Sequence, residues 1–92
     1  MARLVDARHE SDYRVWLRFS DGLEGVVDLS AELHGAVFEP LRELASFRQL
    51  RFDPDTHTVP WPNGADLAPE HLHELLRRVA IQPLQPMGSA RA

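Results

Sequence analysis

The most regular alternation of apolar and polar residues lies between residues 13 and 19, in the segment YRVWLRF. Every second side chain there is apolar, and a period of two is typical of a β-strand that buries one face. Arginine or tryptophan fills the positions between, so the opposite face is amphipathic. The residues expected to face the core are Tyr13, Val15, Leu17 and Phe19.

Two neighbouring segments extend this strand into a sheet. Residues 3–7 have the pattern of a shorter strand, and residues 24–29 have the pattern of a returning strand. The residues Ser20-Asp21-Gly22 between the second and third segments are typical turn formers. We therefore predict a three-stranded antiparallel meander.

A second hairpin is expected from residues 50–53 and 56–61, joined by Pro54 and Asp55. Pro60 lacks an N–H donor, which favours an edge position. Asp53 and Asp55 resemble the paired aspartates of phosphoryl-transfer loops, but no glycine-rich phosphate cradle or lysine accompanies them. We interpret both aspartates as turn formers.

Helical signals occupy the rest of the chain. A short helical turn is expected at residues 31–33, and Pro40 opens either one helix or two abutting short ones up to residue 48. The last helix is predicted over Pro69–Ala80, because its apolar residues follow the i, i+3, i+4, i+7 spacing of one helix face. That stripe consists of Leu72, Leu75, Leu76 and Val79.

Length and composition fit one small domain. The chain has 92 residues, of which 43% are hydrophobic and 26% are charged, as in ordinary globular proteins. We predict a single α+β domain over residues 1–81, in which a small antiparallel sheet (the three-stranded meander plus the second hairpin) packs on two or three helices. Residues 82–92 contain Pro83 and Pro86 and are expected to form a flexible tail.

Charge and cysteine content exclude several classes of protein. There is no cysteine, so disulfides, thiolate zinc sites and cysteine nucleophiles are excluded. The net charge is −4 and there is no basic block, so direct nucleic-acid binding is not expected. No apolar run has the roughly 18 residues that a membrane helix needs, and no signal peptide is visible, so we expect a cytoplasmic protein.

The histidines and acids near the last helix are poor candidates for catalysis or metal binding. His71 and His73 are two positions apart, so on a helix they point about 200° apart and cannot share an ion. Asp66 precedes the helix and is expected to cap its backbone N–H groups. We predict no catalytic residue, no metal site and no cofactor; a metal-dependent enzyme using Asp66, His71 or His73 is a remote alternative.

Two surfaces are candidates for binding another protein. Arg14, Trp16 and Arg18 share the outward face of the central predicted strand, and Trp and Arg are enriched at interface hot spots. The alternatives are that helices cover this face, or that the arginine stems only stack along Trp16 in water. A second candidate is the corner before the last helix, which contains Trp61, Asn63 and Asp66. The alternative is a structural corner, in which Trp61 anchors the chain, Asn63-Gly64 forms the turn and Asp66 and Pro69 start the helix.

Several short motifs together are similar to one known family. They are Asp12-Tyr13, RFSDG, VVDLS, FEPLRE, FRQLRFDPDT and, above all, WPNGADLAPEHL. In this order they resemble the short bacterial proteins catalogued as domain of unknown function number 2442, over about residues 5–76. The resemblance implies a compact α+β fold with an antiparallel sheet, and it implies no catalytic residues.

The resemblance also implies a partner. Genes of this family often lie beside genes of a second small-protein family, number 4160, in a toxin–antitoxin-like arrangement. Our first hypothesis is therefore an antitoxin-like interaction protein that binds a small cognate protein encoded nearby; a homodimer is a further possibility. Because some resembling proteins carry a helix-turn-helix segment, the second hypothesis is a ligand-sensing or regulatory domain. That hypothesis predicts a closed, partly apolar pocket near Trp61.

Overall fold

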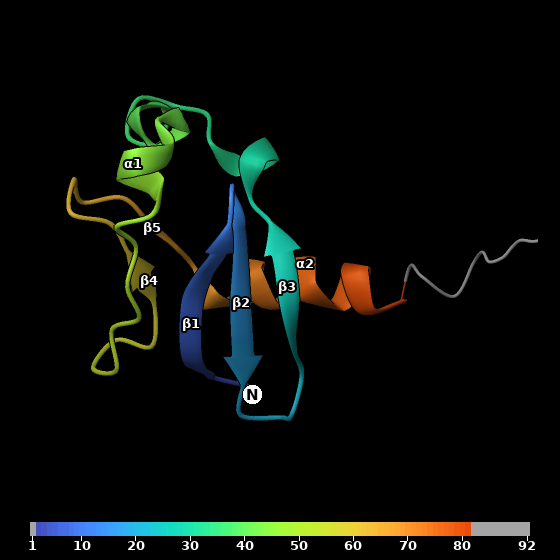
Figure 1. Ribbon diagram of the computed structural model, residues 1–92. Helices are drawn as coiled ribbons and strands as arrows, with labels where there is room; N and C mark the ends of the chain where they lie inside the picture. Colours follow the sequence, from blue (N-terminus) through green and yellow to red (C-terminus); the bar gives the residue numbers. More distant parts are fainter. Residues whose placement is uncertain (1, 82–92) are drawn as a thin grey trace, which may run out of the picture.

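The computed structural model describes residues 2–81 (Figure 1). The tail predicted for residues 82–92 lies outside the described residues. Within residues 2–81, no helix has both the length and the apolar character needed to cross a membrane. The fold is α+β, with a three-stranded antiparallel sheet, a separate two-stranded hairpin and short helices around them.

The predicted meander is confirmed. It consists of β1 (Leu4–Ser11), β2 (Arg14–Phe19) and β3 (Glu24–Asp28), in the order β1-β2-β3. β1 is longer than the expected 3–7, because its pairing with β2 continues past two register shifts as far as Ser11. The turn from β2 to β3 is closed by the Gly22 N–H donating to the Phe19 carbonyl at 3.0 Å.

The face of the sheet predicted to be buried is buried. Val15 and Leu17 have no exposed surface, and Phe19 is 2% exposed. Tyr13 differs, since it lies in the turn before β2 and is only half-buried. Its hydroxyl donates to the Arg42 carbonyl, and its ring lies edge-on to that of Phe47 at 5.1 Å.

The last helix covers this buried face. α2 (Pro69–Ile81) crosses behind the strands and contacts β3 (Figure 1). Gly25 of β3 has no side chain at the crossing, where a Cβ atom would lie 3.0 Å from Cδ1 of Leu76. The helix can approach the sheet this closely because position 25 is glycine.

The apolar stripe of α2 is confirmed in part. Leu72 and Leu76 have 0% and 1% exposure, and Leu75 is half-buried. The prediction that Val79 belongs to the buried stripe is wrong, because Val79 is 41% exposed. Its position follows from the crossing at Leu76: the residues after Leu76 lie past β3, where the sheet no longer covers the helix (Figure 1).

Short helices connect β3 to the second hairpin. They are η1 (Ser30–Glu32), η2 (Glu39–Arg42) and α1 (Leu44–Phe47). Of the two alternatives for residues 40–48, the structure has two abutting short helices, with Glu43 in extended conformation between them. Phe47 at the end of α1 is fully buried and joins these helices to the core.

A second hairpin exists, but only one of its two strands lies inside a predicted segment, residues 56–61. Residues 53 and 58 form only an isolated bridge, and the hairpin pairs β4 (Val59–Pro60) with β5 (Asp66–Leu67). The apolar run that ends at Trp61 therefore pairs with the chain after it. Proline has no N–H to donate, and Pro60 takes part here only as an acceptor: its carbonyl accepts the Arg51 N–H at 3.3 Å.

Gly64 provides a test of the loop between β4 and β5. Its φ is +93°, a left-handed conformation in which a β-branched side chain is strained. Gly64→Val is expected to lower the free energy of unfolding by about 1–3 kcal/mol, measured by urea denaturation. Gly64→Asn is the matched control, since asparagine tolerates this region, and it should lose clearly less. Equal losses would contradict the strain argument.

Candidate functional site

The face of the sheet opposite α2 carries the candidate site. Because side chains alternate along β2, Arg14, Trp16 and Arg18 point away from the buried Val15 and Leu17. No helix covers this face in Figure 1, in which α2 lies behind the strands. The antiparallel register places residues of both neighbouring strands beside them. We call this set the open face; it consists of Asp6, Arg8, Arg14, Trp16, Arg18, Glu24, Val26 and Asp28.

Trp16 is at the centre of the open face. The guanidinium carbons of Arg8 and Arg18 lie 5.3 and 5.8 Å from the centre of its ring, within the range of cation–π contacts. These contacts explain why the indole is half-buried although no helix among residues 2–81 covers it. A hollow of about 240 Å³ beside it is lined by Trp16, Arg8, His9 and Glu10. The stacking in water that we considered from sequence is therefore present, and it leaves the indole partly exposed.

Carboxylates balance the arginines of the open face. Asp6 forms a salt bridge with Arg8 at 3.3 Å. The carboxylate of Asp28 accepts the Ser30 N–H at 2.8 Å, and this hydrogen bond holds the pKa of Asp28 below its usual value. Glu24 is exposed, and no salt bridge joins it to another residue within 2–81. Its charge is therefore available to a partner.

The prediction that Trp61 belongs to an interaction surface is wrong. It is 3% exposed, and its indole Nε1 donates to the Phe47 carbonyl at 2.9 Å. Its ring packs against those of Phe47 and Phe38, with centroids 5.7 and 6.4 Å away. A tryptophan that anchors a hairpin and one that binds a partner have the same sequence context, so only the packing distinguishes them.

Asn63 and Asp66 are exposed at this corner, with different roles. Asn63 holds the loop: its amide donates to the Val37 carbonyl at 3.0 Å and its side-chain oxygen accepts the Ala65 N–H at 3.1 Å. Asp66 lies in β5, and among the described residues no N–H donates to its carboxylate. The expected helix cap is therefore wrong. The first hydrogen bonds of α2 are the ordinary backbone ones, in which the Ala68 carbonyl accepts the N–H groups of His71 and Leu72.

An open hollow of about 330 Å³ adjoins this corner. Its lining residues are Arg51, Pro60, Trp61 and Pro62. The ligand-sensing hypothesis predicts a closed pocket near Trp61, whereas this hollow is open to solvent.

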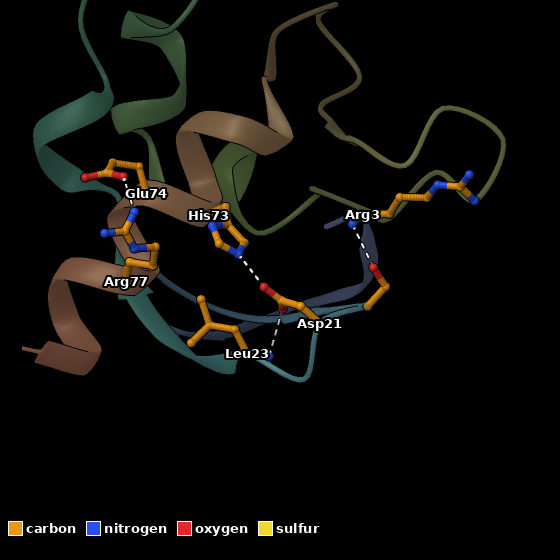
Figure 2. Close-up of polar contacts among 7 residues, drawn as sticks. Arg3, Asp21, Leu23, His73, Glu74 and Arg77 are labelled. Carbon is orange, nitrogen blue, oxygen red and sulfur yellow. Dashed lines mark hydrogen bonds and ion pairs between the residues drawn. The ribbon is translucent and has the colours of Figure 1, made fainter. Parts of the chain in front are cut away.

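Both histidines of α2 pair with carboxylates from distant segments. Nε2 of His71 lies 2.7 Å from Glu32. Nε2 of His73 lies 2.9 Å from Asp21, and Figure 2 shows this second contact. The two rings have separate partners, as their spacing predicted, but the partners are 39 and 52 residues away in the chain. No signal in the sequence identifies such partners. Within residues 2–81, no three His, Asp or Glu side chains are grouped so that they could hold a metal ion.

The Asp21–His73 pair fastens the β2–β3 turn to α2. The Asp21 carboxylate accepts from His73 and also from the Leu23 N–H at 3.0 Å (Figure 2). The His73 hydrogen bond is the main cause that lowers the pKa of Asp21, and the Leu23 N–H adds to it. The rings of His73 and Phe19 form a T-shaped pair, with centroids 4.7 Å apart. This geometry makes the pair a structural latch.

Acid is expected to break the Asp21–His73 hydrogen bond and to remove its contribution to stability. Because the folded-state pKa of Asp21 is lowered, its contribution to stability is fully present above the usual carboxyl pKa and is lost as pH falls through the folded-state value. Asp21→Asn should therefore flatten the acid side of the stability curve, measured by urea denaturation between about pH 6 and about pH 2. Asp66→Asn is the control and should leave the curve unchanged. An identical acid slope in the wild type and Asp21→Asn would contradict the assignment.

Comparison with known proteins places the chain in a family. No curated protein matches it, and no solved structure matches it. The family described as "Protein of unknown function (DUF2442)" matches residues 4–78, which include all five strands and most of α2. The chain therefore belongs to the DUF2442 family.

Proposed function

We propose that this protein is an antitoxin-like interaction module that binds a small cognate protein through the open face. The observation that carries the proposal is the half-exposed Trp16 held between two arginines on a sheet face that no helix covers. Trp and Arg are the residues most enriched among interface hot spots. Cation–π contacts fix the indole before binding, so less side-chain freedom is lost when a partner covers it.

The charge of the open face favours a protein over a nucleic acid. Three arginines there are matched by three carboxylates, and the whole chain has a net charge of −4. A phosphate backbone needs a basic surface, and the acids beside Trp16 would repel it. Interleaved charges of both signs instead fit the polar rim of a protein interface.

The antitoxin-like role rests on the family resemblance. Genes of such proteins often have a neighbour that encodes a second small protein, and the neighbour is the first candidate partner. A protein that acts by covering its partner needs a rigid surface and no catalytic group of its own. The open face supports this proposal through its central indole, which two cation–π contacts hold in place.

Trp16→Ala tests the proposal. The variant should bind the product of the adjacent gene about thirtyfold more weakly, the effect of losing a hot spot of about 2 kcal/mol. Its melting temperature should fall only by a few degrees, because the indole lies outside the core cluster. Affinity is measured by calorimetry after co-expression and size-exclusion chromatography of the two proteins.

Val37→Ala is the matched control, since Val37 is an exposed apolar residue away from the open face. It should bind as the wild type does. Two products that elute separately at micromolar concentration would sink the proposal, as would equal binding by Trp16→Ala.

A second candidate is a ligand-sensing domain, which would bind its ligand in the open hollow beside Trp61 instead of in the closed pocket expected from sequence. Three of the four residues that line this hollow are apolar and the fourth is Arg51, a combination that suits a small ligand with an acidic group. A metabolite at 100 times its Kd would stabilise the fold by about 2.7 kcal/mol, so the melting temperature should rise by several degrees. Arg51→Ala should abolish that rise. An unchanged melting temperature across a panel of metabolic acids would remove this candidate.

A further inference from the structure

The outer edge of β3 has free backbone groups. In the β2–β3 ladder the Phe19 N–H donates to Leu23 and the Leu29 N–H donates to Tyr13. Because hydrogen-bonded and non-hydrogen-bonded pairs alternate in an antiparallel ladder, Gly25 and Val27 direct their N–H and C=O groups to β2. The corresponding groups of Glu24, Val26 and Asp28 point away from the sheet. We call these groups the free edge; no backbone hydrogen bond within residues 2–81 uses them.

The other edge of the sheet is partly occupied. On β1 the Ala7 N–H donates to the Asp6 carboxylate at 2.8 Å, and the Leu4 carbonyl accepts from Nδ1 of His57 at 3.1 Å. Two register shifts also interrupt the regular spacing of β1. Bulges and local hydrogen bonds of this kind discourage the addition of a strand. β3 has no register shift, and its one local side-chain hydrogen bond, from the Ser30 N–H to the Asp28 carboxylate, leaves the backbone groups of the free edge unused.

α2 provides a surface on which one more strand next to β3 could pack. The helix crosses β3 at Gly25, where Leu76 makes its close approach, and continues beyond the strand (Figure 1). Residues 77–81 extend about 7.5 Å along the helix axis past this point at about 1.5 Å per residue, whereas neighbouring strands are about 4.8 Å apart. Val79 lies on the same helix face as Leu72, toward the sheet layer, and is 41% exposed. An added strand would cover it.

We infer that the free edge binds an extended segment of a partner protein as a fourth strand, with basic residues facing Glu24 and Asp28 and apolar residues facing Gly25 and Val27. The basic side chains lie on the open face and complement two carboxylates, of which Glu24 has no salt bridge within the described residues. The apolar side chains point toward α2 and Val79. Backbone hydrogen bonds to Val26 supply the centre of the contact.

A second copy of the chain fits this edge poorly. Antiparallel pairing of two β3 strands about Val26 places Glu24 of each copy opposite Asp28 of the other. Like charges directly opposite each other destabilise a strand pair. A segment with the pattern basic, apolar, any, apolar, basic avoids this repulsion, and the pattern reads the same in either strand direction.

The inference rests on the proposed function, because both assign a protein partner, but it can be tested separately. The probe is the acetylated and amidated heptapeptide Gly-Lys-Val-Thr-Val-Lys-Gly, titrated into the full chain and followed by amide chemical shifts. The wild type should bind it about tenfold more tightly than the same peptide with Glu in place of both Lys. The shifts should be largest at Glu24, Val26, Asp28 and Val79.

Two variants identify the contact. Val26→Pro removes an N–H that points away from β2, so the fold is kept while binding of the Lys peptide should fall at least about tenfold. Glu24→Lys changes an exposed side chain and should reverse the preference between the two peptides. If Val26→Pro does not fold, the peptide preference of Glu24→Lys tests the strand addition instead.

The possible outcomes separate the two proposals. Equal binding of both peptides, no binding at millimolar concentration, or a dimer that forms through β3 without peptide would each overturn strand addition. If the product of the neighbouring gene binds Val26→Pro normally but does not bind Trp16→Ala, the result supports binding through the open face and overturns strand addition at the free edge. The reverse result supports the edge and overturns the open face.

Discussion

The packing of α2 on one face of the β1–β3 sheet is the contact on which the rest of the structure depends. Leu72 and Leu76 have almost no exposed surface there, and Gly25 allows the close approach of the helix. A three-stranded sheet with one apolar face needs such a cover, because exposing those apolar side chains to water is unfavourable. Since the buried side chains of the sheet point to the α2 side, the opposite face is free to carry charged and aromatic side chains. The candidate site is therefore a surface presented by paired strands.

The sequence predicted the parts of the fold that local periodicity determines. The alternation around Val15 and Leu17 identified the buried face of β2, and the spacing of Leu72 and Leu76 identified α2. Its errors arose where a residue's role depends on a distant partner. β4 pairs with the later strand β5 and not with residues 50–53, and Val79 is exposed because the sheet ends before it. Neither the pairing partner nor the width of a sheet is encoded in local periodicity.

The same reasoning applies to the candidate site. Arg14, Trp16 and Arg18 could be placed on one face from sequence, because strand geometry fixes alternate side chains. The contribution of Arg8 to the Trp16 platform could not, since it depends on the β1–β2 register. Trp16 pairs directly with Val26 across the β2–β3 ladder. The open face and the free edge are thus neighbouring parts of one surface, and a single partner can contact both.

The Asp21–His73 latch also bears on the order in which the chain folds. It joins residues 52 positions apart, whereas the turn that presents Asp21 closes over only a few residues. Closing a long loop costs more chain entropy than closing a short one, and contacts between distant residues slow folding. The β2–β3 hairpin can therefore form early and hold Asp21 in place before α2 arrives. Docking of the helix then completes the domain, so a chain still emerging from the ribosome has its sheet exposed until residue 73 is available.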